Sequence, residues 1–122
     1  MKRLILLIED NCQNSYMVSY LLGKNDCKVI SASDGPAGIK MAEKYIPDLI
    51  LLDIQLPGMD GYSVARELKA SSTLKKIPII AITSHAMAGD RQKAFSAGCD
   101  GYIEKPINPD SFVEEIEKYF KG

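Results

Sequence analysis

Short apolar runs alternate with longer segments of mixed polarity along the whole sequence, and this alternation limits the possible folds more than any other feature. Five runs have the length of a β-strand. They are Leu4–Ile8, Val29–Ala32, Leu49–Leu52, Ile79–Ile82 and Gly101–Ile103. The first, third and fourth are apolar at successive positions, which is typical of strands covered on both faces of a sheet. We therefore expect a sheet buried between two layers of helices.

The segments between these runs have the length of helices. They are Cys12–Lys24, Pro36–Tyr45, Gly61–Ala70, Ala86–Ala97 and Pro109–Lys121. Alternation of strands and helices predicts a parallel sheet with right-handed crossovers and helices on both faces. The predicted fold class is α/β, a doubly wound (βα)5 three-layer sandwich with a five-stranded parallel sheet.

The last predicted helix has the clearest boundaries. Asn108 can cap its N-terminus, and Pro109 suits its first position. One face carries an apolar stripe that should lie in the core, formed by Phe112, Val113, Ile116, Tyr119 and Phe120. In the second helix, by contrast, Gly38 is expected to cost about 1 kcal/mol relative to alanine.

The chain has 122 residues, which allow one domain with a sizeable core and leave no room for a second. Its 15 Lys and Arg residues nearly balance its 16 Asp and Glu residues, so we expect no nucleic-acid partner. The apolar run that begins at Leu4 is shorter than the about 7 to 15 residues of a secretory signal. We therefore expect a cytoplasmic protein without membrane insertion.

The three cysteines, Cys12, Cys27 and Cys99, are odd in number and widely spaced, and His85 is the only histidine. This pattern favours neither a disulfide framework nor a zinc site. We expect reduced thiols that contribute to packing.

Polar side chains follow four of the five apolar runs. Glu9 and Asp10 follow the first run, Asp53 the third, Thr83 the fourth and Lys105 the fifth. Ligands of doubly wound sheets bind beyond the carboxyl ends of the strands, so we expect these side chains to meet at one edge. Three clustered carboxylates repel one another, and a hard cation relieves that repulsion. The sequence therefore predicts a Mg²⁺ site, with Mn²⁺ as an alternative ion.

The same residues are suited to phosphoryl transfer. With the metal bound, Asp53 can attack a phosphorus atom while Lys105 neutralises the phosphoryl oxygens and Thr83 donates a hydrogen bond. Gln55 stands two residues after Asp53, where an aspartyl-phosphate hydrolase needs a general acid. We therefore expect a site that receives a phosphoryl group and holds it, with slow hydrolysis by water.

Four fragments in this order resemble the receiver domain of two-component response regulators, of the chemotaxis-receiver type. The fragments are LIEDN at 7–11, LLDIQLPGMDG at 51–61, AITS at 81–84 and GYIEKPI at 101–107. The resemblance implies the flavodoxin-like strand order 2-1-3-4-5. It spans the whole chain, so we expect a single receiver domain over residues 1–122 with no output domain. It also implies a phosphoacceptor signalling protein rather than an enzyme. Segments 85–90 and 97–102 are similar to stand-alone cell-division receivers and to receivers appended to hybrid histidine kinases.

The resemblance also implies roles for the site residues. Asp53 would be the phosphoacceptor, Glu9 and Asp10 the acidic metal pair, and the backbone carbonyl of Gln55 the remaining protein ligand of Mg²⁺. Lys105 would be the cationic clamp on the bound phosphoryl group.

Three further residues would border this site: Ser84, His85 and Pro106. The family implies a cis bond before Pro106 that directs the preceding lysine. It also implies that His85, together with Gln55, influences how fast water removes the phosphoryl group.

The implied signalling step couples Thr83 to Tyr102. The added phosphoryl charge would draw Thr83 inward, and Tyr102 would fill the space it leaves. This movement would change the surface of the fourth helix, fifth strand and fifth helix, where a downstream protein would bind. The expected phosphodonor is a histidine kinase or a histidine phosphotransfer protein.

Four other interpretations stay open at this point. The chain could be a receiver excised from a hybrid histidine kinase, although its initial methionine favours a whole gene product. It could be a Mg²⁺-dependent hydrolase of the haloacid dehalogenase type, which Gln55 disfavours. A flavodoxin-like flavin carrier is disfavoured because Glu9 and Asp10 would repel the cofactor phosphate. A phosphate-independent adaptor would have little reason to keep the full charged set.

Overall fold

The computed structural model of the protein describes residues 3–56, 58–83, 89–105 and 107–120, and its centre is a five-stranded parallel sheet. The strands are β1 (Arg3–Ile8), β2 (Cys27–Ala32), β3 (Leu49–Asp53), β4 (Ile79–Thr83) and β5 (Gly101–Glu104). Their order in the sheet is β2-β1-β3-β4-β5. Both the α/β fold class and the flavodoxin-like strand order are therefore confirmed.

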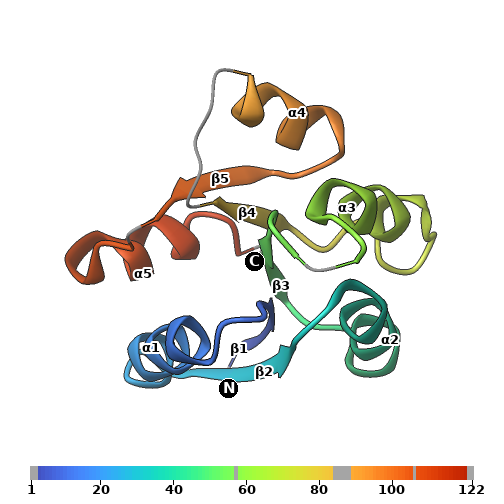
Figure 1. The fold of residues 1–122 in the computed structure, drawn as a ribbon. Coiled ribbons are helices and arrows are strands. Elements are labelled where there is room, and N and C mark those ends of the chain that lie inside the picture. Colours follow the sequence, from blue (N-terminus) through green and yellow to red (C-terminus); the bar gives the residue numbers. More distant parts are fainter. Residues whose placement is uncertain (1–2, 57, 84–88, 106, 121–122) are drawn as a thin grey trace.

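Helices cover both faces of this sheet. They are α1 (Cys12–Gly23), α2 (Gly35–Tyr45), α3 (Gly61–Ala70), α4 (Asp90–Ser96) and α5 (Pro109–Glu117). Helices α1 and α5 lie on one face and α2 and α3 on the other, while α4 stands at the β5 edge (Figure 1). The three predicted layers are present.

Each face of the sheet has its own hydrophobic core, and β1 contributes to both. Ile5 and Leu7 pack toward α1 and α5, whereas Leu6 and Ile8 pack toward α2 and α3. Because successive side chains of a strand point to opposite faces, a strand covered on both sides must be apolar throughout. This arrangement explains why the apolar runs do not alternate with polar residues.

Side-chain caps begin four of the helices. Asn11, Asp34, Asp60 and Asn108 each accept a hydrogen bond from a backbone N–H of the first turn. Helix α4 differs, because its N-cap is Gly89, whose φ of 91° is left-handed. Helix α4 is described from Asp90, and Ala86, where we expected the helix to begin, lies outside the described residues.

The end of α5 was also predicted too late in the chain. The α-helix ends at Glu117 rather than Lys121, because the N–H groups of Tyr119 and Phe120 bond to carbonyls three residues back. This tighter bonding closes the last turn. The apolar stripe still reaches the core, and Phe120 also stacks under Arg3, 4.3 Å from the guanidinium carbon to the ring centroid.

Gly38 has a packing role that outweighs its low helix propensity. A Cβ atom at this position would lie 2.5 Å from Cδ1 of Ile8. The glycine therefore lets α2 approach β1 closely, next to the strand end that carries the polar residues.

The three cysteines are free, but they do not share one environment. Cys27 and Cys99 are buried, and burial raises the pKa of the Cys99 thiol to about 12. Cys12 is exposed at the start of α1, so the expected packing role was wrong for this residue. None of the described helices is long and apolar enough to cross a membrane.

Candidate functional site

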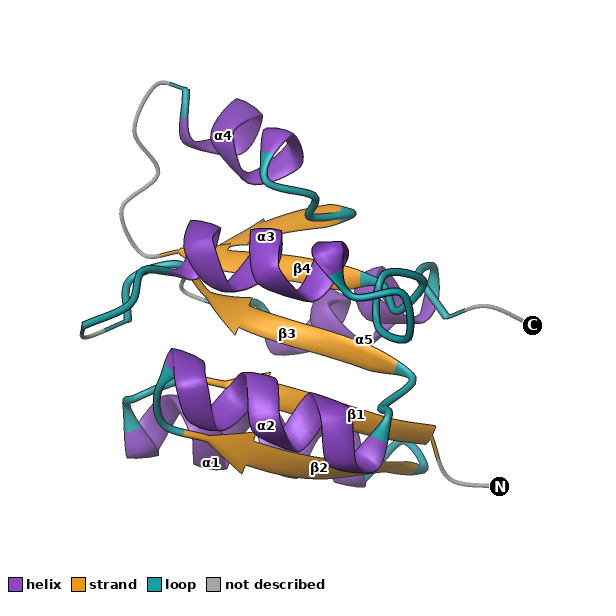
Figure 2. Ribbon diagram, turned by 90° about the vertical axis from the view of Figure 1, so that its right-hand side faces the viewer, coloured by secondary structure: helices purple, strands orange, loops and turns teal. Residues whose placement is uncertain are grey.

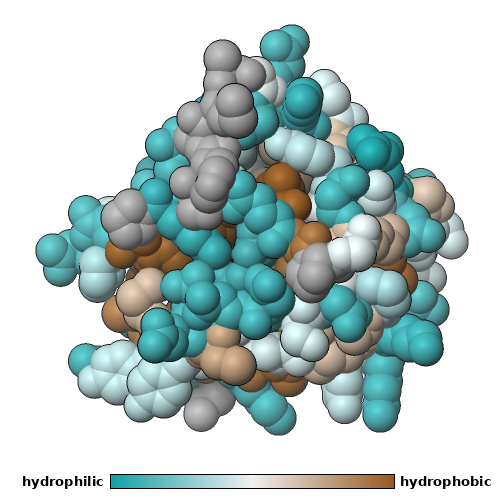
Figure 3. Space-filling model, viewed as in Figure 1, coloured by the Kyte–Doolittle hydropathy of each residue, from teal (hydrophilic) through white to brown (hydrophobic). Residues whose placement is uncertain are grey.

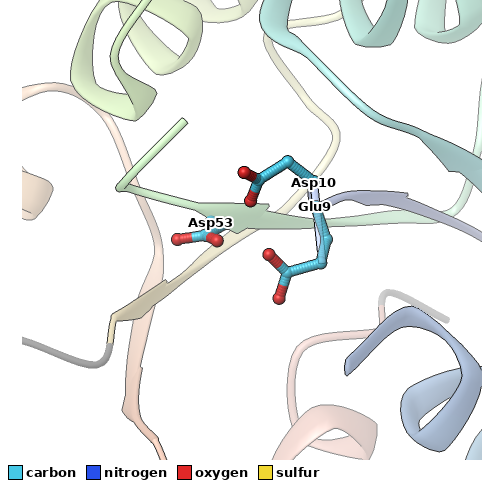
Figure 4. Close-up of side chains that lie close together, drawn as sticks. All are labelled: Glu9, Asp10 and Asp53. Carbon is cyan, nitrogen blue, oxygen red and sulfur yellow. The ribbon is translucent and has the colours of Figure 1, made fainter. Parts of the chain in front are cut away.

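The strands run in the same direction, so their carboxyl ends lie on the same side of the molecule (Figure 2). The predicted polar residues lie at or just after these strand ends. Glu9 and Asp10 directly follow β1, while Asp53 is the last residue of β3. Their carboxylate groups face a common space (Figure 4). One oxygen from each of the three lies within 4.8 Å of the others.

Backbone hydrogen bonds between neighbouring strands fix the positions of these side chains. The N–H of Glu9 donates to the carbonyl of Ala32 at 2.9 Å, which extends the β1–β2 pairing beyond the strand end. The N–H of Lys105 donates to the carbonyl of Thr83 at 2.7 Å. Glu9 and Lys105 are therefore attached to the sheet through their backbones, although both follow the ends of their strands.

Lys105 reaches across the edge from the end of β5 and lies between two carboxylates. Its Nζ atom donates to Oε1 of Glu9 at 2.7 Å and to Oδ2 of Asp53 at 3.4 Å. The three side chains are only 13%, 4% and 6% exposed, respectively. One ammonium thus faces two buried carboxylates, with Asp10 nearby as a third, exposed one.

The two carboxylate oxygens of Glu9 differ in their hydrogen bonds. Among the described residues, Oε2 of Glu9 is buried and accepts no hydrogen bond. A buried carboxylate oxygen without a partner is costly unless something satisfies it. A divalent cation bound by oxygen ligands fits this oxygen and its two neighbouring carboxylates. The donor set therefore suits Mg²⁺ or Mn²⁺.

The pKa values of the buried pair reflect the excess of negative charge. Burial and the neighbouring Asp53 raise the pKa of Glu9 above its usual value, and Lys105 offsets this only in part. Burial alone would lower the pKa of Lys105, but the hydrogen bond to Glu9 and the charges of both carboxylates raise it. Lys105 is therefore a permanent cation, and the site binds a proton or a metal ion more readily than free carboxylates do.

Thr83 and Tyr102 lie on neighbouring strands. Thr83 ends β4 and is 2% exposed, while Tyr102 lies half-buried on β5. The guanidinium carbon of Arg91, from α4, lies 6.0 Å from the centroid of the Tyr102 ring. Burial and nearby Asp90 raise the pKa of Tyr102, which keeps its hydroxyl protonated. Tyr102 thus connects β5 to α4 through its contact with Arg91.

The remaining predicted residues fall in two groups. Gln55 lies exposed two residues after Asp53, and its N–H donates to Oδ1 of Asp53 at 2.9 Å. Ser84, His85 and Pro106 lie outside the described residues, and so does the predicted cis bond before Pro106. Their roles remain predictions.

A hollow of about 500 Å³ beside the carboxylates was not expected from the sequence. It lies between α1 and β2, with Cys12 and Tyr16 from the helix and Ser31 and Ser33 from the strand side. The spacing of four between Cys12 and Tyr16 could have indicated an exposed helix face, but only the fold places that face next to Asp10. On the face of the molecule seen in Figure 1, hydrophilic residues gather near the middle of the surface (Figure 3).

Comparisons with known proteins agree with this geometry. A family model described as "Response regulator receiver domain" matches residues 5–117. The polar-differentiation response regulator DivK of Brucella anthropi is 37% identical over 119 residues, covering 98% of this chain and 97% of the relative.

Two solved structures are similar over nearly the whole chain. The receiver domain of the sensor histidine kinase PA1611 from Pseudomonas aeruginosa, solved with a magnesium ion in its active-site cleft, is 34% identical. It has a TM-score of 0.89 and covers 98% of each chain. The chemotaxis protein CheY4 of Vibrio cholerae is 25% identical with a TM-score of 0.92, covering 98% of this chain and all of its own.

Proposed function

The chain belongs to the response regulator receiver family, and on this premise we propose that it is a single-domain regulator phosphorylated on Asp53. The observation that carries the proposal is the buried arrangement of Lys105 between Glu9 and Asp53, with one oxygen of Glu9 unmatched among the described residues. This arrangement combines a carboxylate nucleophile, a fixed cation and a place for a divalent metal ion.

The metal site in this proposal consists of Glu9, Asp10, Asp53 and the backbone carbonyl of Gln55. When bound, Mg²⁺ supplies positive charge to the phosphoryl oxygens and orients them for in-line displacement. The burial of Glu9 and Asp53 excludes water from one side of the site, which strengthens these electrostatic interactions.

Asp53 performs the covalent step. One carboxylate oxygen forms a bond to the phosphorus of a phosphohistidine, while the bond from phosphorus to the imidazole nitrogen breaks and its electron pair leaves with the imidazole. Lys105 already lies 3.4 Å from Oδ2 of Asp53 and needs little movement to contact the transferred group. The proposed donors are histidine kinases or histidine phosphotransfer proteins.

The proposed output passes through Thr83 and Tyr102. A phosphoryl group on Asp53 adds about −1.5 to −2 charge at neutral pH and attracts hydrogen-bond donors. The Thr83 hydroxyl is a donor buried at the end of the adjacent strand. Its movement would alter the packing of Tyr102 beneath Arg91 and so shift the α4–β5–α5 surface, where a partner protein would bind.

Phosphorylation with a small-molecule donor tests the proposal. The protein is incubated with acetyl phosphate and Mg²⁺, and covalent phosphate is measured by intact-protein mass spectrometry. We expect one acid-labile phosphoryl group that requires Mg²⁺ and that disappears in Asp53→Asn, because the amide cannot act as the nucleophile. Phosphate on Asp53→Asn would refute the assignment, and rapid repeated hydrolysis of a phosphate ester would instead indicate a hydrolase.

A further inference from the structure

The loop between β3 and α3 closes back on the end of the strand that carries Asp53. The N–H of Gly61, the first residue of α3, donates to the carbonyl of Ile54 at 2.9 Å. A Cβ atom on Gly61 would lie 2.5 Å from Cα of Ile54 and 2.7 Å from the carbonyl oxygen of Asp53. Both are backbone atoms, so no change of side-chain rotamer could relieve the overlap. The closure therefore requires glycine.

The peptide unit between Ile54 and Gln55 is held at both of its polar atoms. Its carbonyl oxygen accepts from Gly61, and its N–H donates to Oδ1 of Asp53 at 2.9 Å. The preceding N–H, on Ile54, donates to the carbonyl of Ile82 at 3.0 Å, and the Ile54 side chain is buried. The orientation of this peptide unit is therefore fixed from three directions.

This fixed peptide unit also determines how the Asp53 carboxylate is rotated. Oδ1 faces the N–H of Gln55, while Oδ2 faces Nζ of Lys105 at 3.4 Å. If the peptide unit turned, Oδ1 would lose its backbone donor, and only the longer contact with Lys105 would orient the carboxylate. The carbonyl of Gln55 would also change direction, because it belongs to the next peptide unit of the same loop.

We infer that Gly61 is a positioning residue for the metal and phosphoryl site, although it contacts neither group. It acts through the Ile54–Gln55 peptide unit, which orients both the Asp53 carboxylate and the Gln55 carbonyl. The inference deepens the proposed function and rests on it, since it concerns the same Mg²⁺ site. Residues that orient metal ligands typically change metal affinity about 10- to 100-fold when they are altered.

The test compares Gly61→Ala with a matched glycine variant at the other end of the sheet. Gly98→Ala places a Cβ 2.6 Å from Cγ of Lys69, at a residue whose φ is 108°, so it should also destabilise the fold. Mg²⁺ is titrated into each protein, with amide signals followed by NMR. We expect Gly61→Ala to bind Mg²⁺ about 10-fold more weakly or worse and Gly98→Ala to bind it as the parent does.

A second readout needs no metal. In the metal-free protein the hydrogen-bonded amide of Gln55 should exchange slowly with solvent. We expect its exchange to accelerate much more in Gly61→Ala than in Gly98→Ala, because only the first variant disturbs this peptide unit directly. Equal acceleration in both variants would indicate general loss of stability and would overturn the inference, as would a Mg²⁺ affinity of Gly61→Ala equal to that of the parent.

A backbone variant covers the case in which Gly61→Ala does not fold. Replacing the amide of Gly61 by an ester removes the N–H donor without adding any atom to the crowded loop. Weaker Mg²⁺ binding by the ester variant supports the inference, and unchanged binding contradicts it. Failure of the parent protein itself to bind Mg²⁺ would refute the proposed function instead, so the two failures are distinguishable.

Discussion

A lysine forms ion pairs with carboxylates at each end of the sheet. The two clusters differ in whether all of their buried polar atoms have hydrogen-bond partners. At the amino ends of β4 and β5, Nζ of Lys69 donates to the carbonyls of Lys75 and Ile77 and to Oδ2 of Asp100, at 3.0 to 3.1 Å. At the carboxyl ends, Lys105 faces Glu9 and Asp53, and an oxygen of Glu9 stays unmatched among the described residues.

The cluster around Lys69 has a structural role, because it connects neighbouring elements of the fold. An ammonium group has three donors, and all three are used. Asp100 in turn accepts from the N–H of Ile79 at 2.9 Å, so the cluster links the end of α3 to the starts of β4 and β5. Nothing in it calls for another ligand.

The Lys105 centre is more buried and less balanced. Its carboxylates are 4% and 6% exposed, whereas Asp100 is 44% exposed and can be hydrated. Removing carboxylates from water costs free energy that a single ammonium does not fully offset. In the proposed function, a cation and a phosphoryl group would bind at the carboxyl-end centre and offset this imbalance.

The largest expected effect comes from removing the cation of the carboxyl-end centre. In Lys105→Met, the developing charge on the transferred phosphoryl group loses its fixed partner, and such a loss typically slows a reaction about 10²- to 10³-fold. The rate of phosphorylation by acetyl phosphate at saturating Mg²⁺ measures it.

Lys69→Met is the matched control for this variant, because it removes the same group from the other end of the sheet. We expect it to be phosphorylated at the parent rate. If Lys105→Met also kept that rate, neither lysine would act in phosphorylation, and the proposed functional difference between the two would be wrong.

The stability of the fold should show the reverse dependence. Lys69→Met loses a charge-assisted hydrogen bond and leaves two carbonyls without their donor, which we expect to lower the free energy of unfolding by about 2 kcal/mol. Urea denaturation measures this loss. At saturating Mg²⁺, Lys105→Met should lose less, because the metal ion then neutralises the same carboxylates.

A local readout sharpens the stability prediction. Cys99 is buried next to Asp100, so its alkylation requires opening of this edge, whereas Cys12 is exposed at the other edge. Lys69→Met should speed alkylation of Cys99 and leave that of Cys12 unchanged. Faster labelling of both thiols would indicate that Lys69 stabilises the whole fold rather than the region around Cys99 alone.

The fold and the composition of the site could be predicted because both follow from local sequence patterns. Apolar runs mark the strands, and in a parallel sheet the residues after them must meet at one edge. The structure thus brings Glu9, Asp10 and Asp53 together as expected. The partner choice of Lys105 could not be predicted, because it depends on a contact across 96 residues of sequence.

Glycines account for much of what the sequence did not predict. The sequence predicts only that Gly38 weakens its helix, yet the structure shows that it permits close packing on Ile8. The sequence places Gly61 only as the first residue of a helix, yet the structure shows that it closes the preceding loop on Ile54. Such roles depend on the space around a missing side chain, which no local pattern records. Gly89 is a similar case, since only the structure shows its left-handed backbone before α4.

The smallest expected effect is the pH dependence of stability in the metal-free protein. Unfolded Glu9 loses its proton near its usual pKa of 4.5, whereas the folded protein holds that proton to higher pH. Above 4.5 the unfolded state therefore binds fewer protons than the folded state, and stability must fall as pH rises. One such group contributes a slope of at most about 1.4 kcal/mol per pH unit.

Glu9→Gln isolates this contribution, because the amide does not titrate. The raised pKa of Lys105 does not interfere, since the stability it adds is present below 10.5 and is lost only at higher pH. Urea denaturation from pH 4.5 upward should therefore show a falling difference between the parent and Glu9→Gln. Saturating Mg²⁺ should remove or reverse that fall in the parent, because the ion binds the deprotonated carboxylates and stabilises only the folded state. Asp100→Asn, in the cluster around Lys69, is the control, and its difference from the parent should not depend on Mg²⁺. If Mg²⁺ did not change the pH profile of the parent protein, the assignment of Glu9 as a metal ligand would be contradicted.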